Sequence, residues 1–125
     1  MTANSLKDLA IGFLTTVVAG DVGGAYDQYV GAGFRHHNPY FPGDAASLRK
    51  GMADDEPRCP GKQLIVVNAL EDGDRVAVHS KLIRHDGNPE MAVVHLFRFE
   101  KGRIVELWDV AMVPPAEIVN QHGMF

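Results

Sequence analysis

The sequence contains a single cysteine, Cys59, so it cannot form an intrachain disulfide. A fold held together by packing alone suits a reducing compartment, and we expect the cytoplasm. No segment approaches the roughly 20 consecutive apolar residues that a membrane span requires. Basic residues do not cluster, and 12 Lys and Arg stand against 16 Asp and Glu, a net charge of −4. These absences argue against nucleic acids and membranes as partners.

The length of 125 residues fits one domain, and we expect residues 1–125 to share one core. The composition supports this, because 46% of the residues are hydrophobic and 22% are charged. That balance is typical of a soluble globular protein that can fill a core.

Three helices are predicted in the first half of the chain. Apolar residues at helical spacing predict a helix over residues 5–19, with a capping box at its start. Asp21 can cap a second, short helix whose apolar side includes Tyr26. Residues 34–44 contain two prolines and predict a short extended piece that runs into an irregular loop. A third helix is expected over residues 45–56.

From Gln63 onward the pattern changes to β-branched runs separated by turn signals. The spacers are too short for parallel crossovers, so neighbouring strands must run antiparallel. The predicted strands cover residues 63–71, 75–85, 90–100 and 103–113, with turns at 72–74, 86–89 and 101–102. Helices followed by such a meander indicate an α+β fold, with three helices packed on an antiparallel sheet.

The register of the last hairpin can be predicted from the sequence. A turn centred on Gly102 pairs residues whose numbers sum to about 204, which sets Arg98 opposite Glu106 as a favourable charge pair. The same register sets His95 opposite Asp109. By alternation, one largely apolar face carries both residues. Its members are Val93, His95, Phe97, Phe99, Val105, Leu107, Asp109 and Ala111.

A His and an Asp on an apolar face are costly unless they hydrogen-bond each other or a ligand. Apolar surroundings disfavour an ionised carboxylate and an adjacent imidazole offsets this, which gives a base that works near neutral pH. The structural alternative is a mutually satisfied pair that only fixes the sheet register.

Three segments resemble the SnoaL-like polyketide cyclase family of the nuclear-transport-factor-2-like superfamily: FRFEKGRIVELWDV at 97–110, VAVHSK at 76–81 and HHNP at 36–39. The resemblance implies three helices on a strongly curved sheet that forms a cone-shaped pocket. It also implies that Asp109 is the general acid/base of an aldol-type condensation, helped by His95. Homodimers are implied as well, with the convex sheet face as the interface, where Leu96 and Trp108 would need cover.

The resemblance also suggests residues that contact the substrate. His36 and His37 point to opposite sides of an extended segment, so at most one enters the pocket, and the resemblance selects His37. Strand periodicity places His79 on the face away from His95, whereas the resemblance places it in the pocket. The expected substrate-binding set is His37, Asn38, His79, Phe97, Leu107 and Tyr26.

The sequence therefore predicts an enzyme that acts on a small, largely apolar carbonyl compound. Asp109 would remove a proton next to the carbonyl, and cyclisation, isomerisation or dehydration could follow. The alternative is a non-catalytic domain of the same fold that binds a small molecule or a protein. Three His and an Asp could also bind Zn²⁺ or Fe²⁺, but their spacing matches no recognised ligand motif, so no metal or cofactor is expected.

Overall fold

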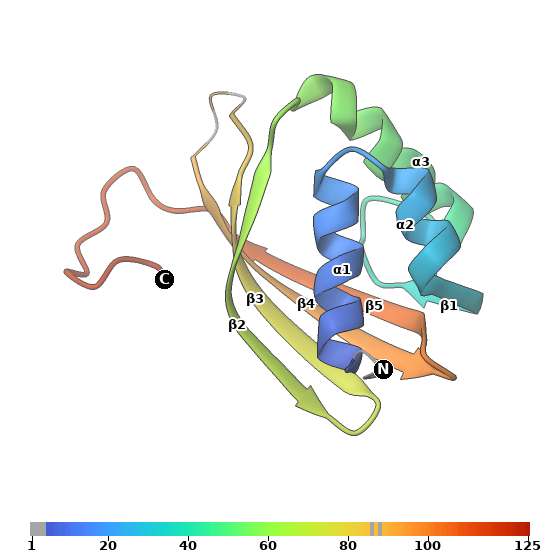
Figure 1. Cartoon of the computed structure of the whole chain (residues 1–125). Coiled ribbons are helices and arrows are strands. Elements are labelled where there is room, and N and C mark those ends of the chain that lie inside the picture. The colour runs from blue at the N-terminus through green and yellow to red at the C-terminus, as the bar shows by residue number, and fades with distance from the viewer. Residues whose placement is uncertain (1–4, 86, 88) are drawn as a thin grey trace.

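The computed structural model describes residues 5–85, 87 and 89–125, and three helices cover one face of a curved five-stranded sheet (Figure 1). The helices are α1 (Leu6–Val18), α2 (Val22–Tyr29) and α3 (Ala45–Asp55), followed by the short 3-10 helix η1 (Glu56–Arg58). The strands are β1 (Val30–His36), β2 (Gln63–Asp72), β3 (Arg75–Ile83), β4 (Met91–Glu100) and β5 (Arg103–Met112), in the spatial order β1-β5-β4-β3-β2. The predicted α+β class is confirmed.

Side-chain caps determine where the helices begin. The Ser5 Oγ accepts a hydrogen bond from the Asp8 backbone N–H at 3.1 Å, as the capping box predicted. Asp21 caps α2 and Asp44 caps α3 in the same way, each through a carboxylate oxygen. The three helices therefore begin within one residue of their predicted starts.

The predicted register of the β4–β5 hairpin is confirmed as far as Arg98, which lies opposite Glu106. Beyond Arg98 the register shifts by one residue, so Phe99 lies opposite Ile104. Ile104, which alternation had not placed on this face, therefore joins the core beside Phe99, while Val105 is the unpaired residue of the bulge and is also buried. A β-bulge places two residues against one, and simple alternation along the sequence does not reveal it.

Strand β1 was predicted only in part, as an extended piece beginning near Phe34. It pairs parallel to β5, with Arg35 opposite Glu106 and His36 opposite Leu107. The ladder continues past the strand, because the His37 backbone N–H donates to the Leu107 carbonyl at 3.0 Å. This pairing brings the loop after β1 beside the end of β5.

The other two predicted strands, β2 and β3, are also confirmed, and β2, β3 and β4 pair antiparallel. In the turn expected at 86–89, Asp86 and Asn88 lie outside the described residues. Within the described part of the chain, no helix is long and apolar enough to cross a membrane.

The core lies between the helices and the concave face of the sheet. Phe13 is at its centre and is fully buried. Its ring makes edge contacts with Tyr26, Tyr29 and Phe97, with centroids 5.5, 6.4 and 6.1 Å away. Aromatic pairs in this arrangement add to the hydrophobic stabilisation. Helix α1 is thereby fixed across the sheet.

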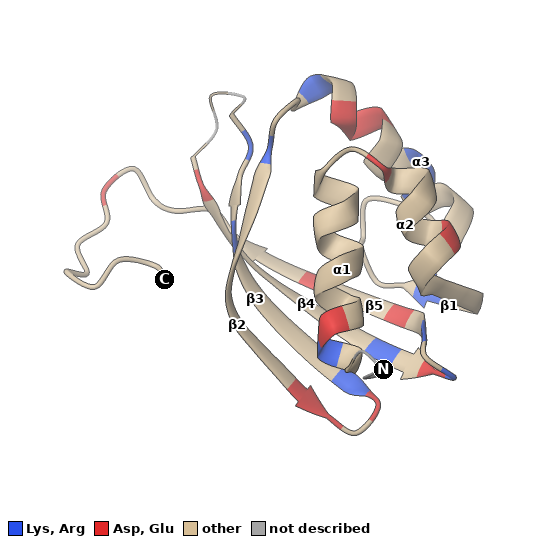
Figure 2. Ribbon diagram, viewed as in Figure 1, with Lys and Arg blue, Asp and Glu red and all other residues tan. Residues whose placement is uncertain are grey.

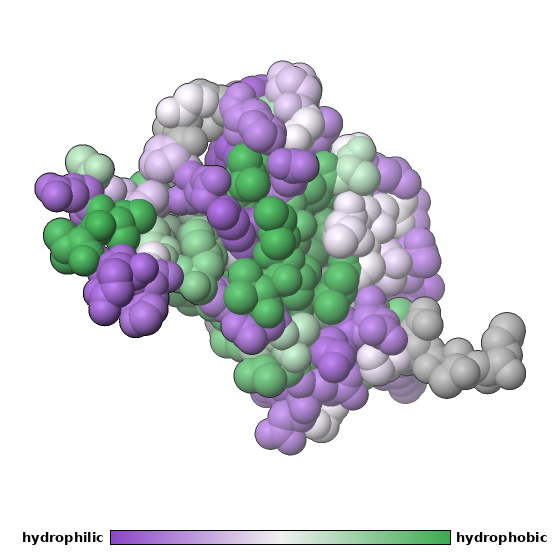
Figure 3. Space-filling model, turned by 60° about the vertical axis from the view of Figure 1, so that its left-hand side comes forward, coloured by the Kyte–Doolittle hydropathy of each residue, from purple (hydrophilic) through white to green (hydrophobic). Residues whose placement is uncertain are grey.

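The convex face of the sheet carries exposed apolar side chains. Figure 3 shows apolar side chains gathered on one side of the molecule. We define the convex patch by five exposed residues of β2, β4 and β5: Ile65, Leu70, Leu96, Val110 and Met112. None of the described helices covers this face, since α1, α2 and α3 lie on the other side of the sheet (Figure 1), but Phe125 of the C-terminal segment packs there against His79 and Lys81 of β3.

Candidate functional site

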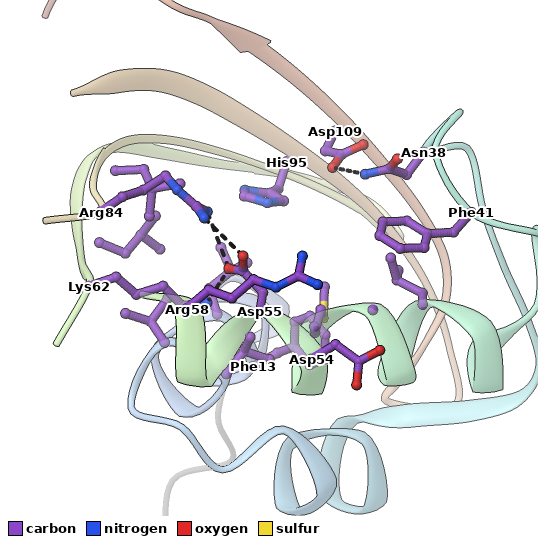
Figure 4. Close-up of a pocket in the computed structure, with 18 residues that line it drawn as sticks. Phe13, Asn38, Phe41, Asp54, Asp55, Arg58, Lys62, Arg84, His95 and Asp109 are labelled. Carbon is purple, nitrogen blue, oxygen red and sulfur yellow. Dashed lines mark hydrogen bonds and ion pairs between the residues drawn. The ribbon is translucent and has the colours of Figure 1, made fainter. Parts of the chain in front are cut away.

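A cavity of about 530 Å³ lies between the helices and the concave face of the sheet. Its walls come from α1, α3, the loop after β1 and the strands β2 to β5, and Figure 4 shows the side chains that project into it. Most of the lining is apolar. The apolar lining residues are Phe13, Leu14, Val17, Val18, Phe41, Leu48, Met52, Leu64 and Leu82.

His95 and Asp109 lie directly opposite each other on β4 and β5, and both line the cavity. Directly opposed residues of an antiparallel pair have Cβ atoms about 5 Å apart. The predicted juxtaposition is therefore present. No hydrogen bond joins the two side chains within the described structure, so they are not the mutually satisfied pair of the structural alternative.

The His95 imidazole is neutral at physiological pH. Burial lowers the pKa of His95 from 6.5 to about 4, and the nearby Asp109 carboxylate only partly opposes this. Its Nδ1 atom is covered and has no hydrogen-bond partner. A buried N–H without an acceptor is rarer than a buried acceptor without a donor, so we place the proton on Nε2. His95 then offers the cavity a neutral N–H donor.

Asp109 is held by a side chain from the distant loop after β1. The Asn38 Nδ2 donates to the Asp109 Oδ2 at 3.0 Å (Figure 4). The described structure records no partner for the other carboxylate oxygen, Oδ1. One oxygen of Asp109 is therefore fixed, and the other can accept a proton from a ligand.

Asn38 is itself held in place by its own loop. Its Oδ1 accepts from the Tyr40 backbone N–H at 2.9 Å, and its backbone N–H donates to the His36 Nδ1 at 3.1 Å. Since Nδ1 of His36 accepts, its proton must lie on Nε2, which donates to the Pro42 carbonyl at 2.6 Å. His36 is only 5% exposed. These hydrogen bonds fix the loop so that the Asn38 amide points toward Asp109.

The prediction that His37 enters the pocket is wrong. Its ring stacks on Trp108 with centroids 4.9 Å apart, and its Nε2 donates to the Glu106 Oε2 at 2.6 Å. Both partners lie on the convex face. The two adjacent histidines do point to opposite sides, as expected, but His36 is the buried one.

Glu106 is the centre of a polar cluster on the convex side. Arg35, His37 and Arg98 all donate to its carboxylate, at distances from 2.6 to 3.2 Å. Hydrogen bonds from Arg35 first and His37 second lower the pKa of Glu106 to about 2. Glu106 therefore joins β1, β4 and β5 as a permanent anion, and its role is structural.

His79 lies on the face away from His95, as strand periodicity predicted and contrary to the resemblance. Its neighbour Val78, not His79, is the residue opposite His95. The His79 ring stacks on Phe125 with centroids 6.3 Å apart, and its Nδ1 contacts the Asn68 amide at 3.1 Å. The prediction that His79 lines the pocket is therefore wrong.

Three more residues expected at the substrate lie in the core behind the cavity wall. Phe97 and Leu107 are at most 3% exposed, and neither lines the cavity. Tyr26 is buried against Phe13, and its hydroxyl donates to the Met52 sulfur at 3.3 Å. Burial raises the pKa of Tyr26, so the phenol stays protonated. Of the six residues expected to bind the substrate, only Asn38 lines the cavity.

Sequence reasoning missed a charged group in the wall: Asp55, Arg58, Lys62 and Arg84. Most of these residues come from a helix end and from loops, where no periodicity marks a direction. Arg84 is the exception, because it continues the alternation of Val78, Ser80 and Leu82 on the concave side of β3. That signal could have found it.

The positions of the histidines also decide whether they could bind a metal ion together with Asp109. His37 and His79 lie on the opposite face of the sheet from His95 and Asp109. The four residues therefore cannot converge on one ion. Within the part of the chain that the structure describes, no group of three or more His, Cys, Asp or Glu side chains could hold a metal ion.

The depressed pKa of His95 gives an expected pH dependence of stability. Between about pH 6.5 and pH 4, the unfolded chain binds a proton at His95 that the folded protein does not bind. The free energy of unfolding should therefore fall as the pH falls through this window, with a contribution of up to about 1.4 kcal/mol per pH unit. Urea unfolding at pH 7, 6 and 5 measures this slope, and His95→Gln should make it shallower. Equal slopes in both proteins would contradict the assignment.

Comparisons with known proteins agree with this architecture. The family model described as the SnoaL-like domain matches residues 10–107. No curated protein is significantly similar to the chain.

Solved structures of similar fold include AclR, a predicted hydroxylase from Streptomyces galilaeus, at 21% identity and a TM-score of 0.73, covering 88% of this chain and 80% of that one. A predicted polyketide cyclase from Acidithiobacillus ferrooxidans is 18% identical with a TM-score of 0.70, covering 89% and 91%. An NTF2-like protein of unknown function from Cytophaga hutchinsonii is 19% identical with a TM-score of 0.67, covering 89% and 93%. At these identities the structures show a shared fold. Because the family model spans most of the sequence, the chain belongs to the SnoaL-like domain family.

Proposed function

We propose that this protein is a cyclase-like enzyme that removes a proton next to a carbonyl group of a small, largely apolar substrate. The observation that carries the proposal is the pairing of Asp109 with His95 in the cavity wall, beside Asn38. A carboxylate with one unoccupied oxygen supplies a base, and a neutral imidazole supplies a hydrogen-bond donor.

The chemistry follows from the positions of these groups. The free Oδ1 of Asp109 accepts the proton, the C–H electron pair moves into the carbonyl, and an enolate forms. The Nε2–H of His95 donates a hydrogen bond to the enolate oxygen, and the imidazole keeps its proton and stays neutral. The enolate carbon then attacks a second carbonyl of the same molecule and the resulting alkoxide takes the proton back from Asp109, or Asp109 returns the proton to another carbon of the enolate. The first outcome is an aldol-type cyclisation and the second is an isomerisation.

The cavity favours this reaction. Its apolar walls lower the local dielectric constant, so hydrogen bonds to developing charge are stronger than in water. Asn38 holds the carboxylate in one orientation, which reduces the reorganisation needed when the proton moves. Asn38 therefore acts as a positioning residue.

The comparisons support a cyclase-like reaction. The family name refers to SnoaL-like domains, and two proteins of similar fold, from Acidithiobacillus ferrooxidans and Streptomyces antibioticus, are described as predicted polyketide cyclases. Cyclisation of such substrates begins with an enolate. The structure offers Asp109 and His95 for that step.

The test is α-proton exchange, which needs only the first half of the reaction. The apolar ketone 2-tetralone is incubated in D₂O, and loss of its α-proton NMR signal is followed with and without the protein. We expect the protein to accelerate exchange in a saturable manner. Binding of 2-tetralone without faster exchange would instead support a non-catalytic binding domain.

We also propose that the protein forms a homodimer through the convex patch. Several exposed apolar side chains on one sheet face are typical of an interaction face, and a face-to-face pair of twofold symmetry would cover them on both copies. Size-exclusion chromatography with light scattering should give twice the chain mass of 13.7 kDa. Charge placed in the patch by Leu96→Lys should give the single-chain mass, whereas the exposed Lys7→Gln on α1 should leave the dimer intact. A wild-type monomer at micromolar concentration would contradict this proposal.

A further inference from the structure

The charged residues of the cavity are divided between two ends. Asp109 lies at one end, beside the loop that carries Asn38 (Figure 4). The other end carries three basic residues, Arg58, Lys62 and Arg84, together with the carboxylates of Asp54 and Asp55. Figure 2 shows these basic positions where α3 runs into β2 and where β3 ends. A ligand that spans the cavity therefore meets a carboxylate at one end and, at the other, three cations against two carboxylates, an excess of positive charge.

Asp55 fixes two of these cations. The Arg84 Nη1 and Nη2 donate to its two oxygens at 3.2 and 2.9 Å, and the Lys62 Nζ donates at 3.0 Å. The Lys62 side chain is only 8% exposed, so its ammonium group is largely shielded from water. The hydrogen bond from Arg84, more than any other contact, lowers the pKa of Asp55. Both cations are thus held in the wall by an ionised carboxylate.

Arg58 differs from these two residues. Its guanidinium points into the cavity on the side opposite the sheet (Figure 4). Among the described residues, it is in no ion pair, since Asp55 contacts Lys62 and Arg84 while the neighbouring Asp54 contacts Lys50 at 2.6 Å. A guanidinium presents parallel N–H donors whose spacing matches the two oxygens of a carboxylate. Arg58 is therefore the donor group that remains for a ligand.

We propose that the substrate of this cavity carries a carboxylate group, which Arg58 binds beside Lys62 and Arg84 while the carbonyl end lies at Asp109. The inference rests on the proposed function for the position of the reacting end. Charge also sets the direction of binding, because a reversed ligand would bring its carboxylate against Asp109. The substrate class is thus an apolar keto acid that spans the cavity.

The test compares two ligands of the same size, 2-naphthylacetate and its neutral amide 2-naphthylacetamide, by isothermal titration calorimetry at pH 7 and low salt. We expect the acid to bind wild-type protein about ten-fold more tightly than the amide. Arg58→Gln should reduce this ratio to about two or less, while Arg58→Lys should restore part of it. Lys7→Gln removes the same charge from the exposed face of α1 and should keep the wild-type ratio.

Equal binding of acid and amide to wild-type protein, or a ratio that Arg58→Gln does not change, would overturn the inference. Arg58 is exposed on a short 3-10 helix, so its substitution should leave the fold intact, and an unchanged melting temperature checks this. The 2-tetralone exchange assay reports separately on proton transfer. If the protein binds the acid more tightly than the amide but does not accelerate exchange, the proposed reaction is wrong, whereas the inference that the ligand carries a carboxylate stands.

Discussion

Asp109→Asn lowers the rate constant of 2-tetralone exchange by about 100-fold or more, because an amide cannot accept the proton that the carboxylate takes. Asn has nearly the volume of Asp, so the cavity keeps its shape. Binding of 2-tetralone should therefore change little, and the loss should appear in the maximal rate rather than in the apparent affinity. Exchange rates measured over a range of 2-tetralone concentrations separate the two effects.

Asp54→Asn is the matched control for this substitution. Asp54 also lies at the cavity, but its carboxylate is 52% exposed and pairs with Lys50. The same chemical change there should leave exchange within about two-fold of wild type. Unchanged exchange in Asp109→Asn, or an equal loss in both variants, would show that Asp109 is not the base.

Phe97→Ala lowers the free energy of unfolding by about 4 kcal/mol, the second large effect that the structure predicts. Phe97 is fully buried and packs against Phe13, His95 and Phe99. Truncation removes its apolar contacts and leaves a void among rings that α1 and the sheet hold in place. Urea unfolding followed by circular dichroism measures the change.

The neighbouring Leu96 provides the control for Phe97, since it points to the convex face and is 41% exposed. Leu96→Ala should cost about 1 kcal/mol or less under conditions where the protein is monomeric. Comparable losses at the two positions would contradict the assignment of the two faces. If Phe97→Ala lost ligand binding but not stability, the result would instead support the prediction that Phe97 contacts the substrate.

The pairing of His95 with Asp109 could be predicted because a short turn determines hairpin register. Only four residues separate Arg98 from Arg103, so the turn at Gly102 leaves few ways to pair the strands. The bulge after Arg98 was not predicted. It lies between the turn and the site, so His95 remains opposite Asp109.

The wrong predictions for His37 and His79 show what a resemblance to a family cannot determine. His79 was correctly placed by alternation, a physical property of the strand, and incorrectly by analogy. His37 is one residue away from the buried His36, and a shift of one position along an extended segment reverses the face. A matched motif identifies the segment but does not determine the face.

The contact between Asn38 and Asp109 could not have been predicted from the sequence. It depends on the parallel pairing of β1 with β5, and the two residues are 71 positions apart in the chain. A strand that joins the sheet from so far away leaves no turn signal. Arg58 and Lys62 were missed for a similar reason, since η1 and the segment before β2 meet the end of β3 only in the folded structure, whereas strand alternation could have placed Arg84.

The parallel placement of β1 beside β5 has a consequence for biosynthesis. During translation the early segment that carries Asn38 leaves the ribosome long before the strand that carries Asp109. The helices and the first hairpins can form locally in that interval, whereas the long loop between β1 and β5 closes late and at a large entropic cost. Until then β5 has one unpaired edge and the concave surface lacks its last wall, a state prone to aggregation that chaperones would recognise.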